Sequence, residues 1–176
     1  MPLVVCKRSR SIADVASFRT RSHALRLSPS AADGRVSATI GRKWVTIVHP
    51  PGLAPSDARL QRLALLLVGR LYALEAADDL PSRVARLAAA HGVTYGRVSL
   101  RDMTSRWGSC SSDGRICLNT RLMALPDSLV DMVVLHELAH TVHMNHGAAF
   151  RATLDKMLGG GLAALEAELK TYRFYV

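Results

Sequence analysis

Four residues in the last third of the chain, His136, Glu137, His140 and His146, have the types and spacing that zinc-dependent hydrolysis requires. The first three form an H-E-x-x-H pattern after an amphipathic stretch, which predicts that they lie on a helix. Residues four apart on a helix are about 40° apart around the axis and one turn apart along it. The imidazoles of His136 and His140 can therefore reach one ion, with the carboxylate of Glu137 beside them.

A catalytic zinc ion needs a third protein ligand and an open position for water. His146 follows His140 by six residues, a gap in which the helix can end and the chain can fold back. His143 is an alternative on the same helical face, but it lies about 7.5 Å of axial rise beyond the midpoint of the first pair, which favours a packing or supporting role. Cys110 is a second alternative, as a thiolate ligand, although nothing in its spacing requires this.

We therefore predict one zinc ion bound by His136, His140 and His146. Glu137 is predicted to be the catalytic residue, because a carboxylate beside the ligands can take a proton from zinc-bound water.

The elements around these residues predict an α+β fold, because strands and helices are grouped rather than alternating. Short β-prone runs occur at 24–27, 36–40, 44–48, 94–102 and 116–118, with a turn at Asp33-Gly34 between the first two. Periodicity predicts helices over 56–76, 81–90, 127–143 and 150–172, the last broken at glycines 159–161. Ser56 is expected to cap the first helix and Gly92 to end the second.

Length and composition fit one small globular domain with an appended lobe. The chain has 176 residues, of which 49% are hydrophobic. Because Pro50-Pro51-Gly52 stops the last early strand, we predict a β-rich N-terminal lobe over 1–52 and a catalytic domain over 53–176. No apolar run approaches the roughly 18 residues that span a bilayer, so no membrane segment is expected.

Charge and cysteine content indicate partners and compartment. The formal net charge is +9, and residues 1–43 alone hold nine Lys or Arg against two acidic residues. This lobe is a candidate surface for nucleic acid, although a solvated basic face is the simpler interpretation. The three cysteines, Cys6, Cys110 and Cys117, show no paired spacing, which favours a reducing compartment and a cytoplasmic protein.

Several motifs together resemble the YgjP-like metallopeptidase family, which is similar to the SprT-like and WLM zinc proteases. They are R-W-G-S-C-S at 106–111, I-C-L-N at 116–119, Pro126, the H-E-x-x-H at 136–140, N-H-G at 145–147, and Phe150. The resemblance is specific over about 80–150 and weaker over 1–55. It implies a minimal zincin-like fold, in which a small β-sheet packs over the active-site helix. It also implies zinc bound by His136, His140 and His146, with Glu137 as general base.

The stretch from Trp107 to Cys110 has no role that its residue types alone reveal, and we interpret it as a tight turn anchored by a buried Trp. Substrate is expected to lie extended along an edge strand above the helix, drawn from 94–103 or 115–119.

These inferences predict a zinc metallopeptidase that cleaves peptides or unfolded proteins. A metal-dependent endoribonuclease of the YbeY type is an alternative, because it shares the H-x3-H-x5-H spacing, but such enzymes usually have Gly where this chain has Glu137. A DNA-associated SprT-like protease is another alternative and would need residues 1–43 as its DNA-binding surface. A non-enzymatic zinc module is disfavoured because Glu137 is retained.

Overall fold

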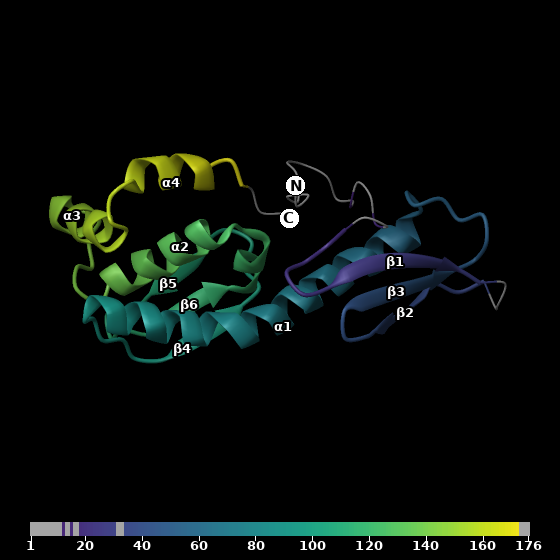
Figure 1. Ribbon diagram of the computed structural model, residues 1–176, viewed down its shortest axis with the longest axis horizontal. Helices are drawn as coiled ribbons and strands as arrows, with labels where there is room; N and C mark the ends of the chain where they lie inside the picture. The colour runs from purple at the N-terminus through teal and green to yellow at the C-terminus, as the bar shows by residue number, and fades with distance from the viewer. Residues whose placement is uncertain (1–11, 13–14, 16–17, 31–33, 173–176) are drawn as a thin grey trace.

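The computed structural model describes residues 12, 15, 18–30 and 34–172, and it shows an α+β protein (Figure 1). The strands are β1 (Ala24–Pro29), β2 (Ser37–Ile40), β3 (Trp44–His49), β4 (Val98–Arg101), β5 (Gly108–Cys110) and β6 (Ile116–Asn119). The helices are α1 (Ala58–His91), the 3-10 helix η1 (Thr120–Ala124), α2 (Asp127–Ala139), α3 (Ala148–Met157) and α4 (Leu162–Leu169). The predicted fold class is confirmed, as is the break between the last two helices.

The strands form two separate three-stranded sheets, ordered β1-β3-β2 and β4-β6-β5. In the first sheet β3 is central because it pairs with both β1 and β2, and Val45 and Ile47, which alternate along it, are fully buried. β1 runs parallel to β3, and β2 runs antiparallel to it. Gly34 adopts the left-handed conformation (φ 68°) expected of a turn, but β1 and β2 are not neighbours. Asp33 lies outside the described residues.

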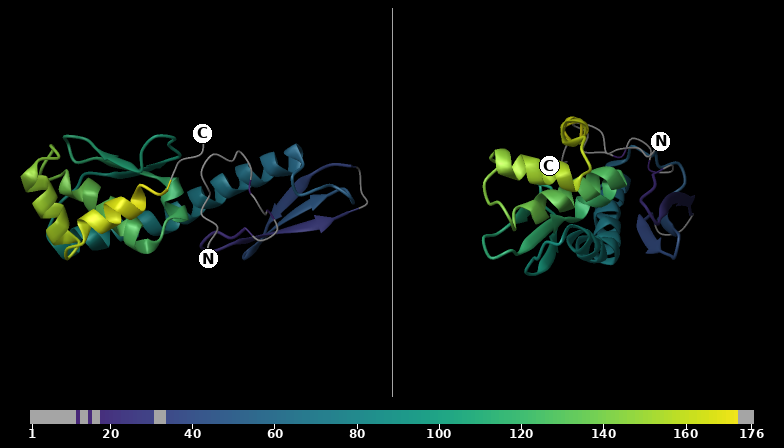
Figure 2. Two further views of the ribbon diagram at one scale, coloured as in Figure 1. Left: turned by 90° about the horizontal axis from the view of Figure 1, so that it is seen from above. Right: turned by 60° about the vertical axis from the view of Figure 1, so that its left-hand side comes forward.

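Helix α1 has 34 residues and passes beside both sheets (Figures 1 and 2). The expectation of two helices was wrong, because the helix continues through Pro81. Proline removes one backbone hydrogen bond there, but Leu80 and Val84 on either side of it are fully buried and hold the helix to the core. Asp57, rather than Ser56, caps the N-terminus by accepting a hydrogen bond from the Arg59 backbone N–H at 2.9 Å. Gly92 ends the helix as predicted, with φ 63°.

The second sheet carries α1 and α2 on one side (Figure 2). Ile116 and Leu118 of the central strand β6 are buried toward these helices. Helix α2 ends at Ala139 with His140 as its C-cap, four residues earlier than the predicted helix over 127–143. The chain turns at this point, where both the backbone N–H and the hydroxyl of Thr141 donate to the Leu138 carbonyl. This early end releases the residues that follow to fold back over the helix.

Buried side chains from both sheets and all four α-helices belong to one hydrophobic cluster. A division of the chain near residue 52 stays a prediction. None of the described helices is long and apolar enough to cross a membrane.

Candidate metal centre

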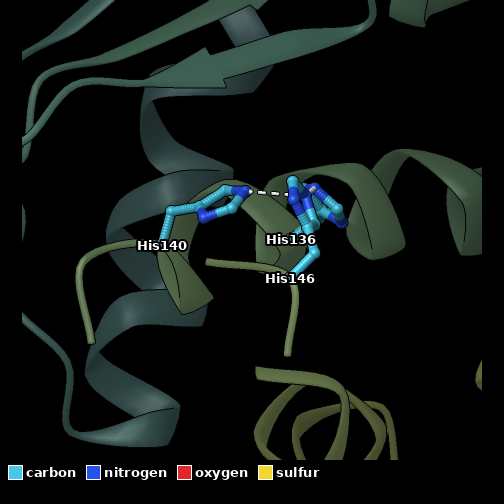
Figure 3. A group of neighbouring side chains, drawn as sticks. All are labelled: His136, His140 and His146. Carbon is cyan, nitrogen blue, oxygen red and sulfur yellow. Dashed lines mark hydrogen bonds between the residues drawn. The ribbon is translucent and has the colours of Figure 1, made fainter. Parts of the chain in front are cut away.

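Three imidazoles converge where α2 ends. His136 and His140 lie one turn apart at the C-terminal end of α2, and the loop after the helix brings His146 back against them (Figure 3). The Nε2 atom of His146 lies 3.1 Å from Nε2 of His140 and 3.2 Å from Nε2 of His136. These three residues form a group whose ligand atoms all lie within 4.8 Å of one another.

The spacing of these nitrogen atoms fits a tetrahedral zinc site. Zinc–imidazole bonds of about 2.0–2.1 Å at tetrahedral angles place ligand nitrogens about 3.3 Å apart, close to the two separations from His146 of 3.1 and 3.2 Å. Burial, together with the neighbouring charges of His140 and His146, lowers the pKa of His136 to about 4. His136 is therefore neutral near pH 7, with a lone pair that can bind a metal.

The loop also fixes the tautomer of one imidazole. Nδ1 of His140 lies 3.2 Å from the His143 carbonyl, so this nitrogen carries the proton and Nε2 faces the other imidazoles. The side chain of His143 points elsewhere, with its Nε2 3.1 Å from the Thr153 hydroxyl. His143 lies outside the group of three and supports it through its backbone.

Phe150 of α3 packs against all three imidazoles. Its ring centroid lies 4.9 Å from that of His136, 4.5 Å from that of His140 and 4.8 Å from that of His146. The side chain is buried, with 2% of its surface exposed. Phe150 therefore holds the imidazoles at their mutual angles. The sequence marks Phe150 only as part of a motif.

Glu137 is buried beneath strand β5, with 5% of its surface exposed. A Cβ atom added to Gly108 would lie 2.5 Å from Oε1 of Glu137 and 2.8 Å from its Cγ. Only glycine leaves room for the carboxyl group at this position. Burial raises the pKa of Glu137 to about 8, against a smaller lowering by the charge of Arg106.

The interpretation of Trp107–Cys110 as a tight turn around a buried Trp was wrong. Gly108–Cys110 forms β5, which pairs antiparallel with β6, and Trp107 is only half-buried. Sequence reasoning missed Gly108 because its close contact with Glu137 joins residues distant in the chain. The available signal was the glycine inside the W-G-S-C motif.

Asn119 is a second residue whose role the sequence did not reveal. It is fully buried, and its Nδ2 donates to the carbonyls of Met103 and Arg106, both at 2.8 Å. Its Oδ1 accepts from the backbone N–H groups of Met103 and Arg121. Asn119 thereby fixes the loop that leads into β5.

Cys110 is not part of the imidazole group. Its thiol donates to the Ser111 carbonyl at 3.5 Å, and burial raises its pKa, with the Glu137 and Asp113 charges adding to this shift. The thiol is therefore the favoured form.

One of the two ranges expected to supply the substrate-binding edge strand needs correction. Residues 115–119 contain β6, which is the central strand and has no open edge. β4, within 94–103, is an edge strand that packs beside α1. The edge strand next to α2 and Glu137 is β5.

Comparisons with known proteins show which family and which solved structures this chain is similar to. Residues 11–172 match the model of the YgjP-like metallopeptidase domain. The crystal structure of the metallopeptidase zymogen of Methanocaldococcus jannaschii jannalysin is 19% identical, with a TM-score of 0.46 over 52% of this chain and 94% of that chain. That of Pyrococcus abyssi abylysin, also a metallopeptidase zymogen, is 18% identical, with a TM-score of 0.48 over 54% of this chain and 98% of that chain. The curated proteins compared give no match.

The family match covers both sheets and the imidazole group. The predictions of a peptidase and of zinc as its cofactor are confirmed. The chain belongs to the YgjP-like family of zinc metallopeptidases.

Proposed function

We propose that His136, His140 and His146 hold one zinc ion and that Glu137 is the general base in peptide-bond hydrolysis. The observation that carries this proposal is the convergence of three Nε2 atoms, together with a buried carboxyl group on the residue that follows His136 in the same helix. When bound, zinc polarises the scissile carbonyl and acidifies a water molecule. Glu137 and strand β5 contribute the proton transfer and the peptide-binding edge, respectively.

Glu137 is placed to move the proton. Its carboxyl group lies under Gly108, where β5 shields it from bulk water. If a divalent cation were held by His136, His140 and His146, the ionised form of Glu137 would be favoured, because an opposite charge lowers the pKa of a buried acid. Glu137 then accepts the proton of the attacking water and delivers it to the leaving amine.

The substrate is a peptide segment that lies along β5. Among the described residues β5 pairs only with β6, so its other edge has backbone groups available for an added strand. Backbone pairing at this edge binds extended segments with little dependence on sequence. Unfolded proteins supply such segments more readily than folded ones.

A paired assay tests this function against the ribonuclease alternative. Zinc-loaded enzyme is offered an unfolded protein and a structured RNA, before and after chelation and after zinc is restored. We expect protein cleavage that stops on chelation and returns with zinc, and no RNA cleavage. Zinc-dependent RNA cleavage without proteolysis would overturn the proposal.

A second candidate function, nucleic-acid contact, rests on the outward face of the first sheet. A hollow of about 410 Å³ is lined by Arg26, Thr39, Gly41, Arg42, Lys43, Trp44 and Thr46. The guanidinium of Arg26 lies 5.7 Å from the ring centroid of Trp44, which is 44% exposed. Positive charge beside an exposed aromatic ring suits the phosphates and bases of a single strand.

This candidate places the contact at Arg26, Arg42 and Lys43. Arg21 is engaged elsewhere, with Asp127 at 2.6 Å. Replacing the three by Gln should abolish salt-sensitive oligonucleotide binding, whereas Arg62→Gln on α1 should not. Oligonucleotide binding that persists in the triple variant, or that does not weaken as the salt concentration rises, would rule out this candidate function.

We also infer a reducing, cytoplasmic setting. Cys110 and Cys117 are both free thiols, which supports such a compartment.

A further inference from the structure

The face of the second sheet that points away from α1 and α2 carries a polar groove. Ser99, Cys117 and Ser109 lie directly opposite one another on β4, β6 and β5. Their neighbours Ile116 and Leu118 on β6 are buried toward the helices, so this row faces the other way. The groove over it has a volume of about 720 Å³.

Four arginines line this groove: Arg97, Arg101, Arg106 and Arg115. Arg115 is paired with Asp113 at 2.7 Å, and the groove's own carboxylate, Asp102, is paired with Arg121. Across the described part of the chain, no carboxylate lies within salt-bridge distance of Arg97, Arg101 or Arg106. Three guanidinium groups that line one groove and form no salt bridge among the described residues offer a site for anionic groups.

The walls of the groove are held in place. Asn119 binds the carbonyls of Met103 and Arg106, which fixes the loop at one end of the sheet. The β5–β6 turn at the other end is held by Ser111, whose hydroxyl donates to Asp113. The arginines are therefore presented by a rigid frame, which reduces the entropy lost on binding.

One end of the groove lies at β5, the strand along which we propose that the substrate binds. Ser109 and Cys110 of β5 line it, and Arg106 stands two residues before β5. Arg106 lines the groove and precedes by two residues Gly108, the glycine against which the Glu137 carboxyl group lies. A strand added to β5 would lie three strand spacings, about 14 Å, from β4. Four or five extended residues, at about 3.3 Å each, cover that distance.

We propose that this outer groove binds the acidic side chains of the substrate chain, so that the enzyme prefers segments flanked by runs of Glu or Asp. The proposal rests on the proposed function, because it assumes that β5 receives the cleaved segment. Carboxylates would form charge-assisted hydrogen bonds with Arg97, Arg101 and Arg106, and the hydroxyls of Ser99 and Ser109 lie beside them.

The groove's composition favours a peptide over a nucleic acid. No aromatic side chain is among its lining residues, so bases would find no stacking platform. Its continuity with β5 also suits a single extended chain that occupies both places.

The test uses two peptides with the same central segment, flanked on both sides by Glu in one and by Gln in the other. The wild-type enzyme should cleave the Glu peptide with a kcat/KM about tenfold higher, as expected for one or two charge-assisted hydrogen bonds in a half-open groove. The double variant Arg97→Gln/Arg101→Gln should lose this preference and cleave the Gln peptide at the wild-type rate. Arg62→Gln/Arg151→Gln, which changes two arginines outside the groove, should keep it. Equal cleavage of both peptides by the wild type, or a preference that survives in the double variant, would overturn the proposal.

Binding measurements separate failure of this proposal from failure of the proposed function. Zinc-loaded enzyme is titrated with the fluorescent forms of both peptides and with oligo-dT. Tighter binding of the Glu peptide that is lost in Arg97→Gln/Arg101→Gln supports the groove even if no peptide is cleaved. Cleavage of both peptides with no difference in binding between the Glu and Gln peptides would support the peptidase function and overturn the proposed role of the groove. Oligo-dT that displaces the Glu peptide, with weaker binding in the double variant, would reassign the groove to nucleic acid and overturn the proposal.

Discussion

The two sheets of this protein have the same topology but very different chemistry. In each, the first strand runs parallel to the central third strand, and the second strand runs antiparallel to it on the other side. The inner face of the first sheet buries Leu25, Val45 and Ile47, and its one buried imidazole, among the described residues, is His49, whose Nδ1 lies 2.9 Å from the Pro50 carbonyl. The inner face of the second sheet meets α2, which carries Glu137 and two of the imidazoles.

This difference shows that strand order does not determine where chemistry takes place. What distinguishes the second sheet is that α2 packs against it and that β5 leaves space for a side chain of this helix. Gly108 in β5 allows Glu137 to approach the strand, whereas β1, β2 and β3 contain no glycine. If this account is correct, changes in the second half should remove function, and equivalent changes in the first sheet should not.

The largest effect is expected from loss of the third imidazole. His146→Ala should release zinc and abolish cleavage, because two imidazoles alone leave a catalytic site one protein ligand short. His143→Ala should keep zinc, with about a tenfold to hundredfold loss in affinity or activity at most, since it acts through its backbone and a hydrogen bond to Thr153. Metal analysis of the two purified variants measures this. Zinc retained in the first and lost in the second would reverse the assignment.

A smaller but still large effect is expected at Gly108, under which Glu137, the proposed base, lies. Gly108→Ala places a methyl group 2.5 Å from Oε1 of Glu137, so the carboxyl group must move. We expect kcat to fall about a hundredfold, the order of a lost general base, with zinc content unchanged. Gly69→Ala on α1 is the control, because its added methyl group would have no atom within 4 Å. Unaltered kcat in Gly108→Ala would show that β5 does not position the base.

Acid should remove the contribution that His136 makes to the stability of the zinc-free protein. The pKa of His136 is about 4 in the folded chain, against 6.5 as the ordinary value. Between these values the unfolded chain binds more protons at this imidazole, so its contribution to stability is lost as pH falls from about 6.5 toward 4. The raised pKa of Glu137 acts in the opposite direction, so the comparison is made between wild type and a His136 variant that both retain Glu137. Thermal unfolding with a chelator present should show a smaller loss over this range in His136→Asn than in the wild type. Equal losses would contradict the assigned cause.

The smallest effect is expected in the first sheet. Trp44→Ala changes a side chain of β3 that is 44% exposed, and Figure 1 shows β3 and α2 at opposite ends of the molecule. Peptide cleavage should change by no more than about twofold. A tenfold loss would show that the first sheet takes part in binding the peptide and would break the contrast between the two halves.

The local features of the site could be predicted from the sequence. His136, Glu137 and His140 belong to one helix with a regular period, and the gap before His146 indicated a chain reversal. The predicted helix over 127–143 ran too far because periodicity alone does not show where Thr141 turns the backbone. The convergence of these residues therefore followed from short-range geometry.

The remaining features depend on contacts between distant residues. Gly108 and Glu137 meet only because β5, a strand of three residues, pairs with β6 and passes over α2. A strand this short shows no alternation, so W-G-S-C was interpreted as a turn. The continuity of α1 through Pro81 depends likewise on buried neighbours, and these override the local preference of proline to end a helix.

The role of Glu137 is tested most directly by measuring the activity of Glu137→Gln together with its zinc content. Gln keeps the shape of the side chain under Gly108 but cannot accept a proton. We expect one zinc per chain, an unchanged fold and a fall in peptide cleavage of about a hundredfold to ten-thousandfold. Cleavage within about twofold of the wild type, with zinc fully retained, would contradict the role of Glu137 as the base.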